Sequence, residues 1–219
     1  MELSFNPESF FESTLLNAKA TKENINELCR KAIHYNFCGV CVNPYYVPLA
    51  DSLLSGSGVK LVSVVGFPLG CTSKEMKRYE AEDLFKKNAQ EIDMVLNIGA
   101  LKDKEFSVVI QEIRDVVNVG AVVKVIIETG HLTEGEIVNA CNCLLEGGAH
   151  FVKTSTGFGP RGASLKDVYL LRSILPSEVG IKASGGINSA EFAEKLIFAG
   201  ASRLGTSSAE KIFLEWKKE

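Results

Sequence analysis

The sequence has no marked excess of either charge. Its 219 residues carry 24 Lys and Arg against 27 Asp and Glu, which gives a formal net charge of −3, and the basic residues are scattered along the chain. A nucleic-acid-binding domain usually gathers its cations on one face or in one segment. We therefore expect no nucleic-acid partner.

Long hydrophobic runs are also missing. No segment approaches the roughly 20 consecutive apolar residues that a membrane-spanning helix needs. The N-terminal stretch MELSFNPESFFES lacks the basic segment followed by an apolar segment that is typical of a secretory signal. The sequence therefore predicts a cytoplasmic protein that has no membrane partner.

Histidine is scarce, and the cysteines lack the spacing of metal ligands. The three histidines show no ligand spacing with the six cysteines. The pair Cys38 and Cys41 in CGVC suggests a metal or redox site, but residues three apart on a strand point to opposite faces. Cys141 and Cys143 are two apart on an expected helix and diverge as well. We expect buried, reduced thiols, no metal site and no cofactor.

The sequence does contain a regular alternation of short apolar segments and longer amphipathic ones. The apolar segments are rich in β-branched residues, as strands are. Counting one weaker candidate at 13–17, there are eight of them. The expected strands are 13–17, 37–42, 59–67, 91–98, 121–130, 149–155, 179–184 and 202–206.

Helical periodicity fills most of the intervals between these strands. In the first helical segment, Ile25, Leu28, Cys29, Ala32 and Ile33 share one face of a helix, and the preceding threonine is a plausible N-terminal start. The expected helices are 21–36, 73–88, 104–118, 134–147, 164–175 and 189–200.

This alternation predicts an α/β fold. Its strands are too apolar to face solvent, as in a parallel sheet that helices cover on both faces. Eight βα units in a chain of this length are typical of a (β/α)8 TIM barrel. An open, doubly wound sheet is the alternative, although no GxGxxG follows the first strand. Since no linker or low-complexity segment interrupts the pattern, we expect one domain over residues 1–219.

Charged residues occupy one face of several expected strands. Because strand residues alternate between two faces, Asp93, Lys124, Glu128, Lys153 and Lys182 all fall opposite the stronger hydrophobes, which is the lumen face of a barrel. The two carboxylates and three lysines can compensate one another. One interpretation is a salt-bridge network that only fixes the core, but ionisable groups gathered on neighbouring strands are more typical of a functional site.

Buried lysines beside an aspartate suit Schiff-base chemistry. A lysine attacks a carbonyl only as the neutral amine, and its ordinary pKa is about 10.4. Desolvation and a neighbouring ammonium both lower that pKa. The iminium that forms is an electron sink that lets a carbon–carbon bond break, and a nearby aspartate can move the protons. The residues therefore predict a Schiff-base lyase, without ranking one lysine above the others.

Two glycine-rich or serine-rich turns offer a phosphate site. ASGGIN at 183–188 and GTSSAE at 205–210 each lead from an expected strand into a helix. Such turns present backbone N–H groups to an anion at a helix N-terminus, and barrels often bind phosphate after strands seven and eight. Glycine also serves ordinary turns, so each motif is weak alone. Together they predict a phosphorylated substrate.

Five motifs follow one another along the chain in this order: EIDMVLNIGAL, VKVIIETGHLT, FVKTSTGFG, IKASGGI and GTSS. Together they resemble the deoxyribose-phosphate aldolase family over about residues 12 to 208. The resemblance implies a (β/α)8 barrel with an extra N-terminal helix. It also implies reversible cleavage of 2-deoxy-D-ribose 5-phosphate to D-glyceraldehyde 3-phosphate and acetaldehyde. The partners would be this phosphorylated sugar, the aldehyde and further copies of the chain, as a homo-oligomer that is a dimer or tetramer.

The resemblance also implies roles for single residues. Lys153 would form the Schiff base, Lys182 would perturb Lys153 and help to transfer protons, and Asp93 would complete the proton relay. The implied phosphate-binding residues are Gly157, Gly185, Gly186, Gly205, Ser207 and Ser208. The candidate supporting residues are Cys41, Lys124, Glu128 and Thr156.

The chain departs from the family pattern at three places. Glu12 and Ser13 stand where members often have Asp-His, which could alter hydrogen bonds of the first strand or substrate preference. Ser164 stands where a threonine is common and keeps the hydroxyl that caps the next helix. The C-terminal segment lacks the tyrosine that some members place in the site. The alternative functions are another Schiff-base aldolase acting on a phosphorylated sugar and a non-catalytic sugar-phosphate sensor.

Overall fold

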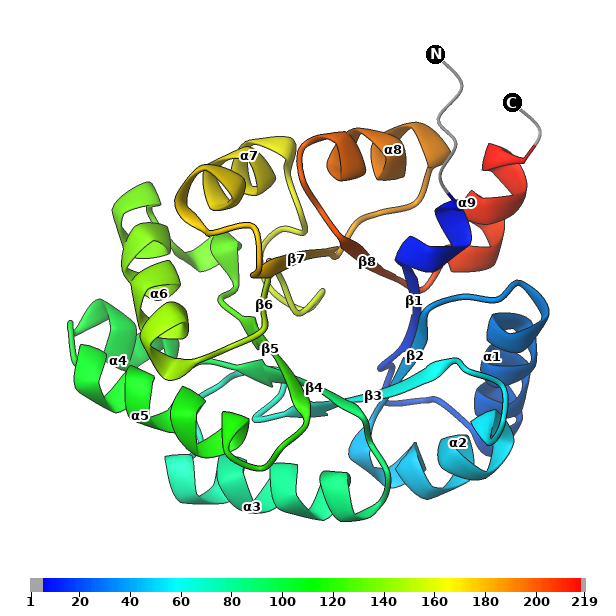
Figure 1. Ribbon diagram of the computed structural model, residues 1–219, viewed down its shortest axis with the longest axis horizontal. Helices are drawn as coiled ribbons and strands as arrows, with labels where there is room; N and C mark the ends of the chain where they lie inside the picture. Colours follow the sequence, from blue (N-terminus) through cyan, green and yellow to red (C-terminus); the bar gives the residue numbers. More distant parts are fainter. Residues whose placement is uncertain (1–5, 218–219) are drawn as a thin grey trace.

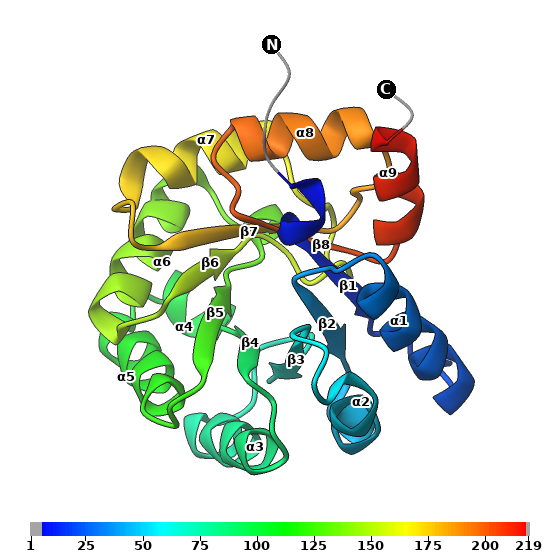
Figure 2. The same cartoon turned by 45° about the vertical axis from the view of Figure 1, so that its right-hand side comes forward.

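Eight parallel strands close into a barrel in the computed structural model, which describes residues 6–217. The strands pair in chain order, and the first also pairs with the last (Figures 1 and 2). The TIM barrel is therefore confirmed, and the open sheet is wrong. The strands are β1 (Phe11–Leu15), β2 (Gly39–Val42), β3 (Lys60–Val65), β4 (Glu91–Val95), β5 (Val122–Ile126), β6 (Phe151–Lys153), β7 (Gly180–Ser184) and β8 (Arg203–Thr206).

Helices surround the barrel (Figure 1). The α-helices are α1 (Lys22–His34), α2 (Val47–Leu54), α3 (Lys74–Lys86), α4 (Ile98–Lys102), α5 (Phe106–Val117), α6 (Glu134–Gly147), α7 (Leu165–Ile174), α8 (Ala190–Phe198) and α9 (Ala209–Trp216). The sequence did not predict α2 or α4, and it gave no bounds for α9, although it did predict a helix after the turn at 205–210. The N-terminal helical element among the described residues is η1 (Pro7–Phe10), a short 3-10 turn. None of the helices described within 6–217 is both long enough and apolar enough to cross a membrane.

Polar side chains fix where several helices begin. Thr21 and Asn24 form a capping box at the start of α1, in which each side chain accepts from the other residue's backbone N–H. Ser164 accepts from the backbone N–H of Asp167 at 3.1 Å and caps α7, as predicted. These caps satisfy N–H groups that have no partner within the helix.

The strand alternation divides the side chains into two layers. Ile92 and Met94 on β4 and Val123 and Val125 on β5 are buried in the main hydrophobic core. The alternate positions carry charges into the lumen, where Asp93 on β4 lies in register with Lys124 on β5. Lys153 and Lys182 are likewise in register on β6 and β7. Strand pairing therefore brings charges that are far apart in the sequence into one buried layer.

Candidate active site

Asp93 lies at the centre of the charged layer. Its Oδ2 accepts from Nζ of Lys153 at 2.7 Å and from Nζ of Lys182 at 2.6 Å. Its Oδ1 is 3.2 Å from Nζ of Lys124. All four side chains are buried. The three lysines that the strand pattern placed on the lumen face therefore meet at one carboxylate.

Glu12 is a member of this cluster that sequence reasoning missed as a site residue. Its side chain is 1% exposed and pairs with Lys182, which also pairs with Asp93. Glu12 Oε1 is also 3.4 Å from Nζ of Lys124 and 3.8 Å from Nε of Arg203. The expected first strand began at residue 13, but β1 begins at Phe11 and includes Glu12. The departure from the family pattern at Glu12 was the available signal.

The charges in the cluster set one another's protonation. Burial alone would raise the pKa of Asp93, but Lys124, Lys153 and Lys182 outweigh it and hold that pKa well below its usual value. Burial would lower the pKa of Lys182, yet Asp93 and Glu12 raise it well above its usual value. At neutral pH, Asp93 is therefore a carboxylate and Lys182 an ammonium.

Glu128 does not join the lysines, so the expected compensation between them is wrong. β5 ends at Ile126, and Glu128 adopts a left-handed conformation with φ 52°, so strand alternation no longer directs its side chain. Its buried Oε2 accepts from the backbone N–H of Thr156 at 3.0 Å and from the hydroxyl of Thr156. Both residues hold the loop after β6, and Glu12 and Glu91 supply the carboxylates that Glu128 was expected to supply.

A cavity of about 390 Å³ opens beside the charged layer, among the loops that follow β6, β7 and β8. All six predicted phosphate-binding residues line it, as does Thr156. Lys153 is the one basic side chain among the described residues that line the cavity, and Asp93 and Lys182 lie behind it. The geometry therefore distinguishes Lys153 from the other lysines, which the strand pattern alone could not do.

Backbone geometry makes the cavity rim suitable for an anion. Gly185 and Gly186 have φ values of 84° and 74°, which side chains rarely tolerate. Ser207 and Ser208 line the cavity where α9 begins, and Ser208 is the residue before its first turn. A helix N-terminus offers unpaired N–H groups and a favourable dipole to an anion. Gly205 has another reason to be glycine, because a Cβ there would lie 2.8 Å from Cε of Lys182.

Cys41 belongs to a small apolar cluster beside the charged layer. It is buried with Leu16, Val62 and Val64, and Phe67 packs against them. Burial raises the pKa of the Cys41 thiol to about 11, so the thiol stays protonated at neutral pH. Cys71 is exposed and Cys38 is half-buried, which corrects the expectation that every thiol is buried, and the described cysteines form no disulfide. No group of three metal-ligating side chains occurs among residues 6–217.

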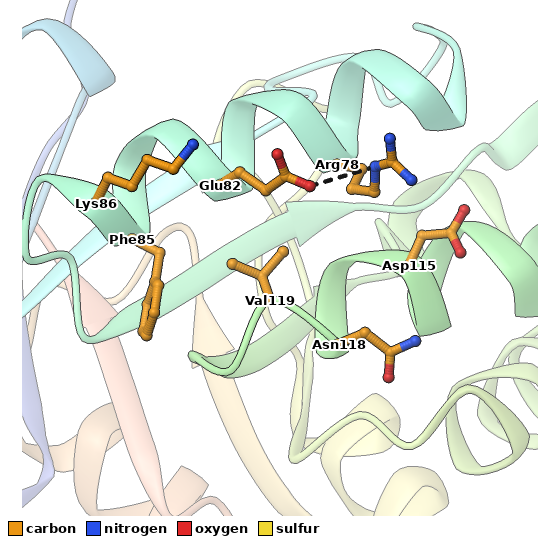
Figure 3. Close-up of a pocket in the computed structure, with 7 residues that line it drawn as sticks. All are labelled: Arg78, Glu82, Phe85, Lys86, Asp115, Asn118 and Val119. Carbon is orange, nitrogen blue, oxygen red and sulfur yellow. Dashed lines mark ion pairs between the residues drawn. The ribbon is translucent and has the colours of Figure 1, made fainter.

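A second hollow, of about 400 Å³, lies on the outer surface between α3 and α5 (Figure 3). Arg78 and Glu82 line it and pair with each other at 3.4 Å, and Asp115 lies across from them. None of the predicted site residues lines this hollow. Its side chains are those of an exposed helix pair and bring no buried ionisable cluster together.

Comparison with known proteins gives a consistent family. Residues 9–215 match the model of the DeoC/LacD family of aldolases. A deoxyribose-phosphate aldolase of Thermococcus kodakarensis is 52% identical over 209 residues, 93% of each chain. One of Caldanaerobacter subterraneus is 48% identical, covering 100% of this chain and 96% of that one. A tetrameric deoxyribose phosphate aldolase structure from Aeropyrum pernix has a TM-score of 0.89 and 36% identity, covering 96% of this chain and 92% of that one.

Proposed function

The chain belongs to the DeoC/LacD family of aldolases, and we propose that it cleaves 2-deoxy-D-ribose 5-phosphate reversibly through a Schiff base on Lys153. The products are D-glyceraldehyde 3-phosphate and acetaldehyde. The enzyme is thus a carbon–carbon lyase, like its relatives at about 50% identity. The observation that carries the proposal is Lys153, a lysine that reaches the cavity while touching the buried Asp93.

The first half of the reaction builds the iminium. The neutral amine of Lys153 adds to the C1 aldehyde of the open-chain sugar, and loss of water leaves a C=N bond. Lys182 is the nearby proton donor, because its raised pKa keeps it an ammonium. Asp93 contacts both amines and is the carboxylate through which protons pass between them.

The second half breaks the bond between C2 and C3. A base removes the proton of the C3 hydroxyl, the bonding electrons move into the iminium, and D-glyceraldehyde 3-phosphate leaves. The enamine that remains takes a proton at C2, and water then hydrolyses the new iminium to acetaldehyde and free Lys153. Because the pKa of Asp93 is well below its usual value, Asp93 is a weak base alone and works together with Lys182 through water.

The phosphate would bind at the rim. The six residues proposed for it line the cavity on the loops after β6, β7 and β8, and α9 begins beside two of them. These positions leave the opposite end of the open-chain sugar to Lys153. The residue roles rest on this geometry and on the family motifs.

We also infer a homo-oligomer, because a related aldolase from Aeropyrum pernix is tetrameric. The single domain over residues 1–219 and the cytoplasmic location stay predictions. The alternative functions are another phosphorylated-sugar aldolase and a non-catalytic sensor. Turnover of 2-deoxy-D-ribose 5-phosphate distinguishes this proposal from both.

The test is release of acetaldehyde from 2-deoxy-D-ribose 5-phosphate, followed as its reduction by NADH and added alcohol dehydrogenase. We expect turnover by the wild type and its loss in Lys153→Met. Lys166→Met, at a lysine whose side chain is 78% exposed, is the matched control and should keep full activity. Turnover of a different phosphorylated sugar only, or a folded protein without any turnover, would contradict the proposal and favour one of the alternatives.

A further inference from the structure

Glu128 combines a buried carboxylate with a strained backbone. Its φ of 52° lies in the left-handed region, and outliers of this kind in residues other than glycine cluster at functional sites. The side chain is 2% exposed, and its Oε1 has no hydrogen-bond partner within residues 6–217. Because a buried carboxylate is costly unless it is hydrogen-bonded, the contacts that do hold Glu128 indicate what it is there for.

The side chain of Glu128 is hydrogen-bonded to the loop after β6. Its Oε2 accepts from the backbone N–H of Thr156 at 3.0 Å and from the Thr156 hydroxyl. Since that hydroxyl donates its proton to Glu128, Thr156 Oγ1 is free to accept from the backbone N–H of Phe158 at 3.0 Å. Hydrogen bonds to a charged group are among the strong ones. One carboxylate therefore fixes two backbone N–H groups of this loop, one directly and one through a hydroxyl.

Gly157 lies between the two residues that are fixed in this way. All three line the cavity. The φ of Gly157 is 88°, and its backbone N–H has no hydrogen-bond partner within residues 6–217. The N–H groups on either side, those of Thr156 and Phe158, are both used inside the protein. The contacts of Glu128 therefore leave the N–H of Gly157 available to an anion in the cavity.

The same loop packs against the glycine turn after β7. A Cβ at Gly185 would lie 3.0 Å from Cα of Gly162 and 3.5 Å from Cα of Gly157. The loop is equally close to the carboxyl group, because a Cβ at Gly159 would lie 2.7 Å from Cδ of Glu128. Glu128 therefore determines where the loop after β6 lies relative to the turn after β7, and both line the same cavity.

We propose that Glu128 is a positioning residue that sets the affinity of the cavity for the substrate phosphate, by fixing the loop so that the N–H of Gly157 is presented to the anion. This inference rests on the proposed function, in which the loops after β6 and β7 bind the phosphate. Glu128 does not itself line the cavity within residues 6–217. It therefore acts on the substrate through Thr156 and the backbone that follows.

Other contacts hold the lysine proposed as the nucleophile. Lys153 lies on β6, where it is in register with Lys182 on β7, and its Nζ is 2.7 Å from Oδ2 of Asp93. Glu128 contacts the chain only after this strand has ended. A change at Glu128 should therefore weaken phosphate binding and leave the chemical step at Lys153 as it is.

The test compares substrates with and without a phosphate. Glu128→Gln keeps the shape of the side chain but removes its charge. We expect KM for 2-deoxy-D-ribose 5-phosphate to rise by about tenfold, the effect of one hydrogen bond to a charged group. The values of kcat for this substrate and of kcat/KM for unphosphorylated 2-deoxyribose should stay those of the wild type. Inorganic phosphate, titrated into each protein in a calorimeter, should also bind about tenfold more weakly.

Gly159→Ala tests the same contact from the loop. Its added Cβ, 2.7 Å from Cδ of Glu128, should displace the loop from the carboxyl group and raise KM with kcat unchanged. Because both variants disturb one contact, the double variant should raise KM by less than the product of the two single effects. Gly159→Ala also keeps the inference testable if Glu128→Gln does not fold.

Glu136→Gln is the matched control. Glu136 Oε2 likewise accepts from the backbone N–H and the hydroxyl of one threonine, Thr133, at 2.8 Å and 3.1 Å, but at the start of α6. We expect Glu136→Gln to leave KM and the affinity for inorganic phosphate unchanged.

Two results would overturn the inference. One is an unchanged KM and an unchanged phosphate affinity in Glu128→Gln and Gly159→Ala. The other is an equal loss of kcat/KM on the phosphorylated and the unphosphorylated sugar, which a merely structural role would produce. Absent turnover by the wild type would instead contradict the proposed function, and the phosphate titration would still test the role of Glu128.

Discussion

Glu12→Gln is the substitution that tests the charged layer most simply. Gln keeps the shape of Glu12 but removes its charge, which leaves Lys182 with Asp93 as its one close carboxylate. Removing one partner of a buried ion pair costs about 3–5 kcal/mol. We expect a loss near the lower end, about 3 kcal/mol, because Asp93 continues to compensate Lys182. For a chain of this length, that lowers the Tm by roughly 6–12 °C.

Urea unfolding at pH 7 measures this loss, with the Tm as a second readout. Glu27→Gln is the control, because Glu27 is an exposed glutamate that pairs with Arg30 at 2.8 Å and Lys31 at 3.1 Å. Exposed pairs contribute about 0–1 kcal/mol. A Glu12→Gln loss no larger than the Glu27→Gln loss would refute the claim that the buried cluster depends on Glu12.

The stability lost in Glu12→Gln should also depend on pH. Burial would raise the pKa of Glu12, but Lys124 and Lys182 outweigh it and lower that pKa from its ordinary 4.5. A carboxyl whose pKa is lowered by folding contributes stability above its unfolded pKa and loses that contribution as the pH falls through the folded pKa. The stability difference between wild type and Glu12→Gln should therefore shrink below pH 4.5. A difference that is the same at pH 7 and in acid would contradict the sign of this shift.

Three other substitutions test the cavity and its supports. Gly205→Ala places a Cβ 2.8 Å from Cε of Lys182, so we expect it to displace that lysine and lower kcat by about tenfold or more; an unchanged kcat would contradict the packing argument. Gly186→Ala strains a backbone at φ 74° and should raise KM for 2-deoxy-D-ribose 5-phosphate, with kcat/KM for unphosphorylated 2-deoxyribose as the comparison that should not change. Ser164→Ala removes the cap of α7 and should cost about 1 kcal/mol in urea unfolding without changing kcat/KM; a large loss of activity would give Ser164 another role.

The barrel could be predicted from the sequence because two periodicities are strong in it. Alternation on β4 to β7 placed Asp93, Lys124, Lys153 and Lys182 on the lumen face, and the structure brings these side chains together. Short elements were harder to find. The five-residue α4 is too short to show a helical period, and the sequence gives α2 no capping side chain.

The rest of the cluster depends on tertiary contacts that local patterns do not encode. Glu12 lies 170 residues from Lys182 in the sequence, and their pairing requires the barrel to close between β1 and β8. Glu128 was misplaced because alternation was extended past Ile126, where the backbone turns left-handed. The exposure of each lysine to the cavity likewise depends on how the loops after β6, β7 and β8 fold.

The most direct test of the Schiff base on Lys153 is reductive trapping. Incubation with acetaldehyde and borohydride converts an iminium into a stable N-ethyl lysine, which peptide mass mapping then locates. We expect the ethyl group on the peptide that contains Lys153. An ethyl group on the peptide of Lys182 instead, or folded protein with no adduct, would contradict the role given to Lys153.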